Sequence, residues 1–244
     1  MEILKPALKA LYFLAMVAAI VFTFKVPGAA GFMNPDLARV IFYHLPCAIG
    51  SSCFLIAAPI YAWFSLSKHK PVWDVRAVAA MEIAWTLGVL TLITGSLFSK
   101  VQWGSWWNWD PRQTSFLICM LIVTGYFTLR LAFGDASRRA AHSAAYILAS
   151  VIPVMFLIFV YPRLPQVTTL HPDVLRDGGF DTNYTVGFFS MFALVMIACG
   201  WAFRMRVKAG VLEYESEELD VRMADRDRAP ASGVVRPVPV PPER

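Results

Sequence analysis

The sequence predicts an all-α fold: a polytopic integral membrane protein, built as a bundle of six transmembrane helices with both termini in the cytoplasm. Hydrophobic residues make up 57% of the 244 residues and charged residues only 16%, whereas a soluble domain carries about 25% charged residues. The apolar residues lie in long runs, and about 20 such residues can span a bilayer core of roughly 30 Å. Lysine and arginine gather at alternate ends of these runs.

Six apolar runs are long enough to span a membrane. They cover residues of about 10–28, 40–64, 77–98, 115–133, 143–161 and 185–203. A segment in lipid must satisfy its own backbone hydrogen bonds, as a helix does, or belong to a closed barrel. The runs lack the alternation of polar and apolar residues that is typical of barrel strands, so we expect six helices.

The first run has an alternative interpretation as a cleaved signal peptide. Lys5 and Lys9 precede an apolar stretch, and small residues follow at positions 28–31, which is the pattern of a secretory signal. The run is long and continues through Phe22, Phe24 and Val26, which favours a transmembrane helix. Under either interpretation the next connection lies outside the cytoplasm.

The basic residues near the run ends predict the orientation. Eleven lysines and arginines flank one set of ends and six flank the other, and the richer side faces the cytoplasm. The outer connections are then about 29–39, 99–114 and 162–184. We expect residues 1–208 to form one membrane domain, and residues 209–244 to form a disordered cytoplasmic tail, because this segment turns to mixed charge and then to proline.

No motif of a soluble catalytic site is present in the sequence. It lacks a Walker A loop, HExxH, GxSxG and a glycine-rich dinucleotide turn. The four cysteines fall inside predicted spans and form no CxxC pair, so a thiol redox function is not expected. We therefore predict that the chain is not an enzyme, and nothing indicates a nucleic-acid partner.

The middle outer connection holds WGSWWNWDPRQTS, residues 103–115, with four of the eight tryptophans of the chain. On a helix Trp103, Trp106 and Trp107 would share one face, and Trp109 would widen it to an aromatic wall. Such a wall suits a large, flat, apolar ligand, with Arg112 and Lys100 able to pair with carboxylates at its edge. The alternative is a membrane-interface anchor, where indole is common.

Asp110 has a simple structural role available. It precedes Pro111, with Gln113 three residues after it, and this spacing predicts an N-cap for the fourth span that is close to a capping box. A cap does not exclude a second role for the carboxylate.

Two histidines lie on the predicted outer side, His44 at the start of the second span and His171 in the last outer connection. Neutral imidazole is a common metal ligand, and two histidines flanking a tryptophan wall could supply both axial ligands of a haem iron. An interfacial hydrogen-bonding role is the alternative for His44. His69 and His142 lie among basic residues on the cytoplasmic side, where we expect them to be solvated.

The tryptophan stretch, with an outer histidine on each side and six spans, resembles the CcmC family of haem exporter proteins. The stretch matches the tryptophan-rich WWD motif of that family, and the resemblance covers about residues 1–208. It implies a protein of the bacterial inner membrane that binds haem b at the periplasmic face and delivers it to the haem chaperone CcmE for c-type cytochrome biogenesis. The implied partners are CcmA, CcmB, CcmD and membrane lipid.

The resemblance also implies roles for individual residues. His44 and His171 match the two proposed axial ligands of the iron. The haem-presenting motif corresponds to Trp103, Trp106, Trp107, Trp109 and Asp110. Arg39 matches a polar position in the first outer segment, where it could meet a haem propionate or, equally, a lipid headgroup.

Two other functions remain open from the sequence. A haem-translocating permease would require a polar lining in several spans, and Glu82 is the one intramembrane carboxylate that suggests it. We expect Glu82 to pair with Arg76 or Arg130 near the helix ends. A membrane b-type cytochrome for electron transfer would bury its histidines within the spans, whereas His44 and His171 are predicted at the outer boundary.

Overall fold

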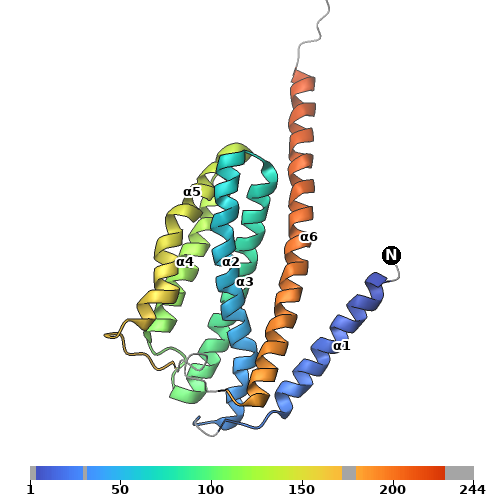
Figure 1. Ribbon diagram of the computed structural model, residues 1–244. Coiled ribbons are helices and arrows are strands. Elements are labelled where there is room, and N and C mark those ends of the chain that lie inside the picture. The colour runs from blue at the N-terminus through green and yellow to red at the C-terminus, as the bar shows by residue number, and fades with distance from the viewer. Residues whose placement is uncertain (1–3, 30–31, 172–179, 229–244) are drawn as a thin grey trace, which may run out of the picture.

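The protein is a bundle of long helices, as a computed structural model shows (Figure 1). The structure describes residues 4–29, 32–171 and 180–228, and it contains no strand within them. The elements, in chain order, are α1 (Leu4–Lys25), η1 (Pro35–Val40), α2 (Ile41–Lys68), α3 (Pro71–Trp103), α4 (Pro111–Leu131), α5 (Ala136–Met155), η2 (Phe156–Val160), η3 (Tyr161–Arg163) and α6 (Thr182–Arg228). Within the described residues, six helical segments are long and apolar enough to cross a membrane, which confirms the predicted fold class.

Proline begins two of these helices and precedes the change from α-helix to π-helix at the end of α5. Pro71 and Pro111 occupy the first helical positions of α3 and α4, where the missing N–H costs no hydrogen bond. Pro153, inside α5, precedes the π-helical turn η2. Arg163 donates from Nη1 to the carbonyls of Ile158 and Phe159, at 2.9 and 3.1 Å, so backbone groups of this irregular turn are satisfied.

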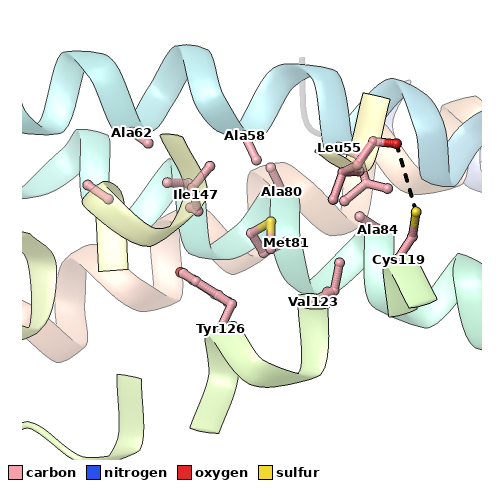
Figure 2. Packing of buried hydrophobic residues seen from close by; sticks show 13 residues of the cluster. Leu55, Ala58, Ala62, Ala80, Met81, Ala84, Cys119, Val123, Tyr126 and Ile147 are labelled. Carbon is pink, nitrogen blue, oxygen red and sulfur yellow. Dashed lines mark hydrogen bonds between the residues drawn. The ribbon is translucent and has the colours of Figure 1, made fainter. Parts of the chain in front are cut away.

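Small residues bring α2, α3 and α4 close together in the middle of the bundle. Ala58 and Ala62 of α2 face Ala80 and Ala84 of α3, and all four side chains are fully buried (Figure 2). Between helices in lipid the hydrophobic effect is weak, and close backbone approach through small residues supplies the packing energy. Ser51 adds a hydrogen bond from its hydroxyl to the carbonyl of Ala84 at 2.8 Å. The α2–α3 pair is therefore a rigid base for side chains nearer the helix ends.

A second apolar cluster fixes the start of α2. Phe42 is fully buried and its ring centroid lies 5.0 Å from that of Tyr184 in α6. Gly187 faces the same ring, and a Cβ there would lie 2.7 Å from it, so only glycine allows this approach. Val26 and Ala38 complete the buried cluster from the first connection. The position of His44, two residues after Phe42, follows from this packing.

Helices α1 and α6 are oriented so that the start of α1 and the end of α6 both point away from the end of the bundle that carries the α3–α4 connection (Figure 1). The described parts of the three connections predicted to be outer therefore lie at one end of the bundle. The assignment of this end to the periplasm remains a prediction from the basic residues.

The prediction of a disordered tail from residue 209 is wrong for residues 209–228. Helix α6 continues without a break to Arg228, and its 47 residues amount to about 70 Å at ~1.5 Å per residue. Glu218 and Arg222 form an i,i+4 pair at 2.6 Å, and Glu217 pairs with Arg139 of α5 at 2.9 Å. The Glu218–Arg222 pair, one turn apart, supports a helix. The mixed charge of this segment therefore belongs to an ion-paired helix and does not indicate disorder. Residues 229–244 lie outside the described residues.

The predicted partners of Glu82 are also wrong. Its carboxylate accepts two hydrogen bonds from Arg206 of α6, at 2.7 and 3.1 Å. Arg130 instead makes a two-pronged pair with Asp74 of α3, at 2.9 and 2.6 Å, and Arg76 lies over the ring of Trp73. No sequence pattern indicates Arg206 as the partner, because the contact joins two helices that are far apart along the chain.

We predict that Arg130→Ala destabilises the folded protein. The Arg130 and Asp74 side chains are only 17% and 13% exposed, and removing one partner of such a pair leaves a charge buried alone, at a cost of about 3 kcal/mol. Thermal unfolding in detergent measures the effect. Arg222→Ala is the control: its pair with Glu218 is exposed and should contribute less than about 1 kcal/mol. Equal loss from both variants would contradict the prediction.

Candidate functional site

Helix α3 ends at Trp103, so the tryptophans do not form a helical stripe. Gly104 has φ of +81°, a left-handed conformation, and its N–H bonds to the carbonyl of Lys100 at 3.1 Å. Glycine adopts this conformation without strain and commonly ends helices. Residues 104–110 are non-helical, and the predicted wall of Trp103, Trp106, Trp107 and Trp109 on one helix face is wrong.

Hydrogen bonds from both flanking helices hold the 104–110 loop in one shape. The buried hydroxyl of Ser99 donates to the carbonyl of Ser105 at 2.8 Å and accepts from the Asn108 side chain at 2.6 Å. Gln113 accepts from the N–H of Asn108 at 3.1 Å, so the side chain at the third position of α4 supports the loop and not the cap residue itself. These bonds hold the backbone of the loop in one conformation, and this conformation sets the positions of its aromatic side chains.

The four tryptophans divide into two inner and two outer residues. The ring of Trp103 packs edge-on against His171, with centroids 5.1 Å apart, and Trp107 lines a cavity. Trp106 and Trp109 are 58% and 73% exposed. Two tryptophan side chains of the motif therefore face the cavity or His171, and two are exposed on the surface.

Asp110 is the most heavily bonded group in this region. Its carboxylate accepts from the N–H of Arg112 at 2.9 Å, which confirms it as the N-cap of α4. It also accepts from the hydroxyl of Thr169 at 2.8 Å, the N–H of Leu170 at 2.6 Å and Nδ1 of His171 at 2.9 Å. Through these contacts one side chain ties the last outer connection to the start of α4.

The charge of Asp110 is stabilised in its buried site. Its side chain is 1% exposed, and this desolvation by itself raises the pKa of the carboxyl. Hydrogen bonds from His171, Leu170 and Thr169 outweigh the desolvation and hold the pKa of Asp110 well below its ordinary value. Asp110 is therefore a carboxylate at neutral pH.

His44 and His171 are brought together at one cavity, and each is held by a single ring nitrogen. Nδ1 of His171 lies against Asp110, and Nδ1 of His44 lies 3.0 Å from the hydroxyl oxygen of Thr94 in α3. Both side chains line the cavity. With Nδ1 engaged in each ring, Nε2 is the nitrogen left to bind a ligand.

The cavity has a volume of about 500 Å³ and lies among α2, α3, α4, the η2–η3 turn and the outer connections. This volume is within the range of about 300–1,000 Å³ that is usual for small-molecule sites. The lining is mainly apolar, with Phe32, Phe98, Phe116 and Phe159 among its residues. Arg112 and Arg163 also line it, and among the described residues no Asp or Glu does. The cavity thus combines apolar walls, two histidines and cationic groups.

Arg39 is not brought into this site. Its Nε donates to the carbonyl of Val26 at 2.7 Å, and its guanidinium pairs with Asp36 at 3.1 Å. Arg39 does not line the cavity. These contacts give it a structural role at the end of α1, which the sequence did not suggest.

Several residues that shape the site were not predicted. Thr169 has a local signal, because it lies two residues before His171. Thr94, Gly95 and Ser99 carry none, since their role depends on how α3 aligns with α2 and with the loop.

The comparisons with known proteins identify the family. A family profile described as "Heme exporter protein C" (CcmC) matches residues 1–222. The heme exporter protein C of Escherichia coli (strain K12) is 34% identical over 147 residues, which are 60% of this chain and 59% of that protein. The protein of the same name from Bradyrhizobium diazoefficiens is 34% identical over 143 residues, 58% of this chain and 53% of that protein.

The chain thus aligns with somewhat over half of the length of these relatives. The family description is that of an exporter, which is a transport protein and agrees with the expectation that the chain is not an enzyme. Because the profile match extends over nearly the whole sequence and includes the tryptophan loop and both histidines, this chain belongs to the heme exporter protein C family.

Proposed function

We propose that the chain binds haem b in the cavity beside the tryptophan loop and delivers it to the haem chaperone CcmE for c-type cytochrome biogenesis. The observation that carries the proposal is the pairing of His44 and His171 at one apolar cavity, each with Nδ1 already bonded. Haem is the cargo here, and iron would be held between the two Nε2 atoms. No covalent bond to the porphyrin is required, so the cargo stays exchangeable.

The contacts behind each histidine suit iron binding. A metal-binding histidine usually donates its other ring N–H to a carboxylate, carbonyl or similar acceptor, which orients the ring and raises its basicity. Asp110 does this for His171, and Thr94 offers an oxygen to His44. Arg112, at the cavity lining, is the group we assign to a propionate.

Delivery requires that part of the cargo or its surroundings be reachable from outside. Trp106 and Trp109 are the exposed members of the loop, and aromatic residues of this kind are frequent anchors in protein interfaces. We assign them to contact with the chaperone, and Trp103 and Trp107 to the haem side of the loop.

The proposed setting is the bacterial inner membrane, with the haem site at the periplasmic face. Support for this side comes from the excess of lysine and arginine at the opposite ends of the spans. In this setting CcmA, CcmB and CcmD would be the other exporter components, and lipid would surround the exposed apolar helix faces.

The alternative functions receive less support. A b-type cytochrome would bind haem between facing helices, whereas His171 lies in a connection after η3. A permease would require charged groups along a path, but Asp74 and Glu82 are each paired with arginine far from the histidines. Neither alternative accounts for the tryptophan loop.

The ligand assignment predicts the spectrum of the purified haem complex. His44→Ala and His171→Ala should each abolish the low-spin bis-histidine bands, because each removes one axial ligand. Absorption spectroscopy of oxidised and reduced protein measures this. His142→Ala is the control, since His142 stacks on Phe133 near the opposite end of the bundle. Unchanged bands in both test variants would remove the assignment.

Asp110→Asn should weaken haem binding without unfolding the protein. The amide keeps a capping oxygen for α4, but the carboxylate behind His171 is lost, and changes of this kind typically cost about 10–100-fold in metal affinity. Haem titration of the apo-protein measures the affinity.

The matched control for Asp110→Asn is Asp135→Asn. Asp135 is the N-cap of α5 and accepts from the N–H of Arg138 at 2.7 Å, away from the cavity. Its variant should bind haem as the wild type does. A similar loss of haem affinity in both variants would contradict a role of Asp110 beyond capping α4.

Trp106→Leu and Trp109→Leu should slow haem transfer to the chaperone while leaving haem binding nearly intact. We expect at least about a fivefold loss in transfer rate for the pair, since an interface anchor typically contributes more than 1 kcal/mol. Trp63→Leu is the control, because Trp63 is also exposed, at 61%, but lies in α2 far from the loop. Normal transfer by the double variant would make both residues membrane anchors only.

A further inference from the structure

The hydrogen bond between His44 and Thr94 has a defined direction. The Thr94 hydroxyl lies 2.7 Å from the carbonyl of Leu90, one turn earlier in α3, and donates to it. A hydroxyl carries one proton, so the same oxygen can only accept from the ring of His44 at 3.0 Å. Nδ1 of His44 therefore carries the proton.

The neighbouring glycine allows this contact. A Cβ at Gly95 would lie 3.0 Å from Cε1 and 3.5 Å from Nδ1 of His44. Contacts of 3.0 Å are shorter than ordinary van der Waals packing, so a larger residue would push the ring away from Thr94. Gly95 and Thr94 of α3 together contact one edge of the His44 imidazole.

We propose that Thr94 is a positioning residue that fixes His44 in the Nδ1–H tautomer and keeps the lone pair of Nε2 available for haem iron. This rests on the proposed function, because it assigns how one of the two ligands is prepared. Thr94 itself contacts neither iron nor porphyrin in this scheme.

The two histidines have acceptors of different charge. His171 is held by a carboxylate and His44 by a neutral hydroxyl. A charged acceptor strengthens the hydrogen bond and raises the basicity of the ring more than a neutral one does. His44 is thus the weaker ligand and the one that yields first when haem leaves.

The test compares Thr94→Val with Thr94→Ser and Thr86→Val in the full-length protein loaded with haem. Valine removes the acceptor at nearly constant shape, and serine retains it. Thr86 is the matched control, because it also lies in α3 and its hydroxyl bonds within the helix, to the carbonyl of Glu82 at 2.9 Å, but it does not line the cavity. The readouts are the reduction potential and the displacement of His44 by added imidazole.

We expect Thr94→Val to raise the reduction potential and to lower haem affinity by about tenfold, the lower limit for loss of such a contact. The lower limit applies because Thr94 is a neutral acceptor, and neutral acceptors form weaker hydrogen bonds than charged ones. Added imidazole should displace His44 at lower concentration. Thr94→Ser should restore wild-type behaviour, and Thr86→Val should match the wild type.

Failure of this inference is distinguishable from failure of the haem function. If His44→Ala changes the spectrum but Thr94→Val matches the wild type in potential and displacement, the role of Thr94 is refuted while the ligand assignment stands. Equal effects of Thr94→Val and Thr86→Val, or failure of serine to restore wild-type behaviour, refute it too. If Thr94→Val folds poorly, Thr94→Ala removes the same acceptor without adding bulk and gives the same comparison.

Discussion

The end of the bundle that carries the tryptophan loop depends on one buried carboxylate. Asp110 caps α4 through the N–H of Arg112 and at the same time accepts from Thr169, Leu170 and His171. A buried carboxylate without partners would be costly, so these donors are what allow it to stay charged. The cap and the contact with His171 are therefore one interaction: the helix start positions the carboxylate, and the carboxylate positions the histidine.

The two histidines are held by different kinds of structure. His44 belongs to α2, whose start is fixed by the packing of Phe42 and whose middle is fixed by alanine contacts with α3. His171 lies in the connection after η3 and is held at the start of α4 by Asp110, which also accepts from the N–H of Leu170. Helix packing therefore sets the position of one histidine, and a single carboxylate sets the position of the other.

The sequence predicted most of the fold and the identity of the site residues, but not their geometry. The six spans follow from the length of the apolar runs, which the bilayer thickness dictates. Placing His44, His171 and the tryptophans together required only the topology. The loop shape did not follow, because the helix end depends on the left-handed conformation of Gly104. Contacts such as Arg206 with Glu82 depend on helix alignment, which apolar runs do not specify.

The charges around the cavity limit what it can bind. Arg112 and Arg163 are among its lining residues, and no carboxylate of the described part of the chain is; the nearby charge of Asp110 is already engaged by its hydrogen-bond donors. The described lining therefore favours an acidic ligand over a cationic one. The lining is best matched by an apolar, flat molecule with acidic groups at one edge and a metal that accepts nitrogen, and haem combines these features.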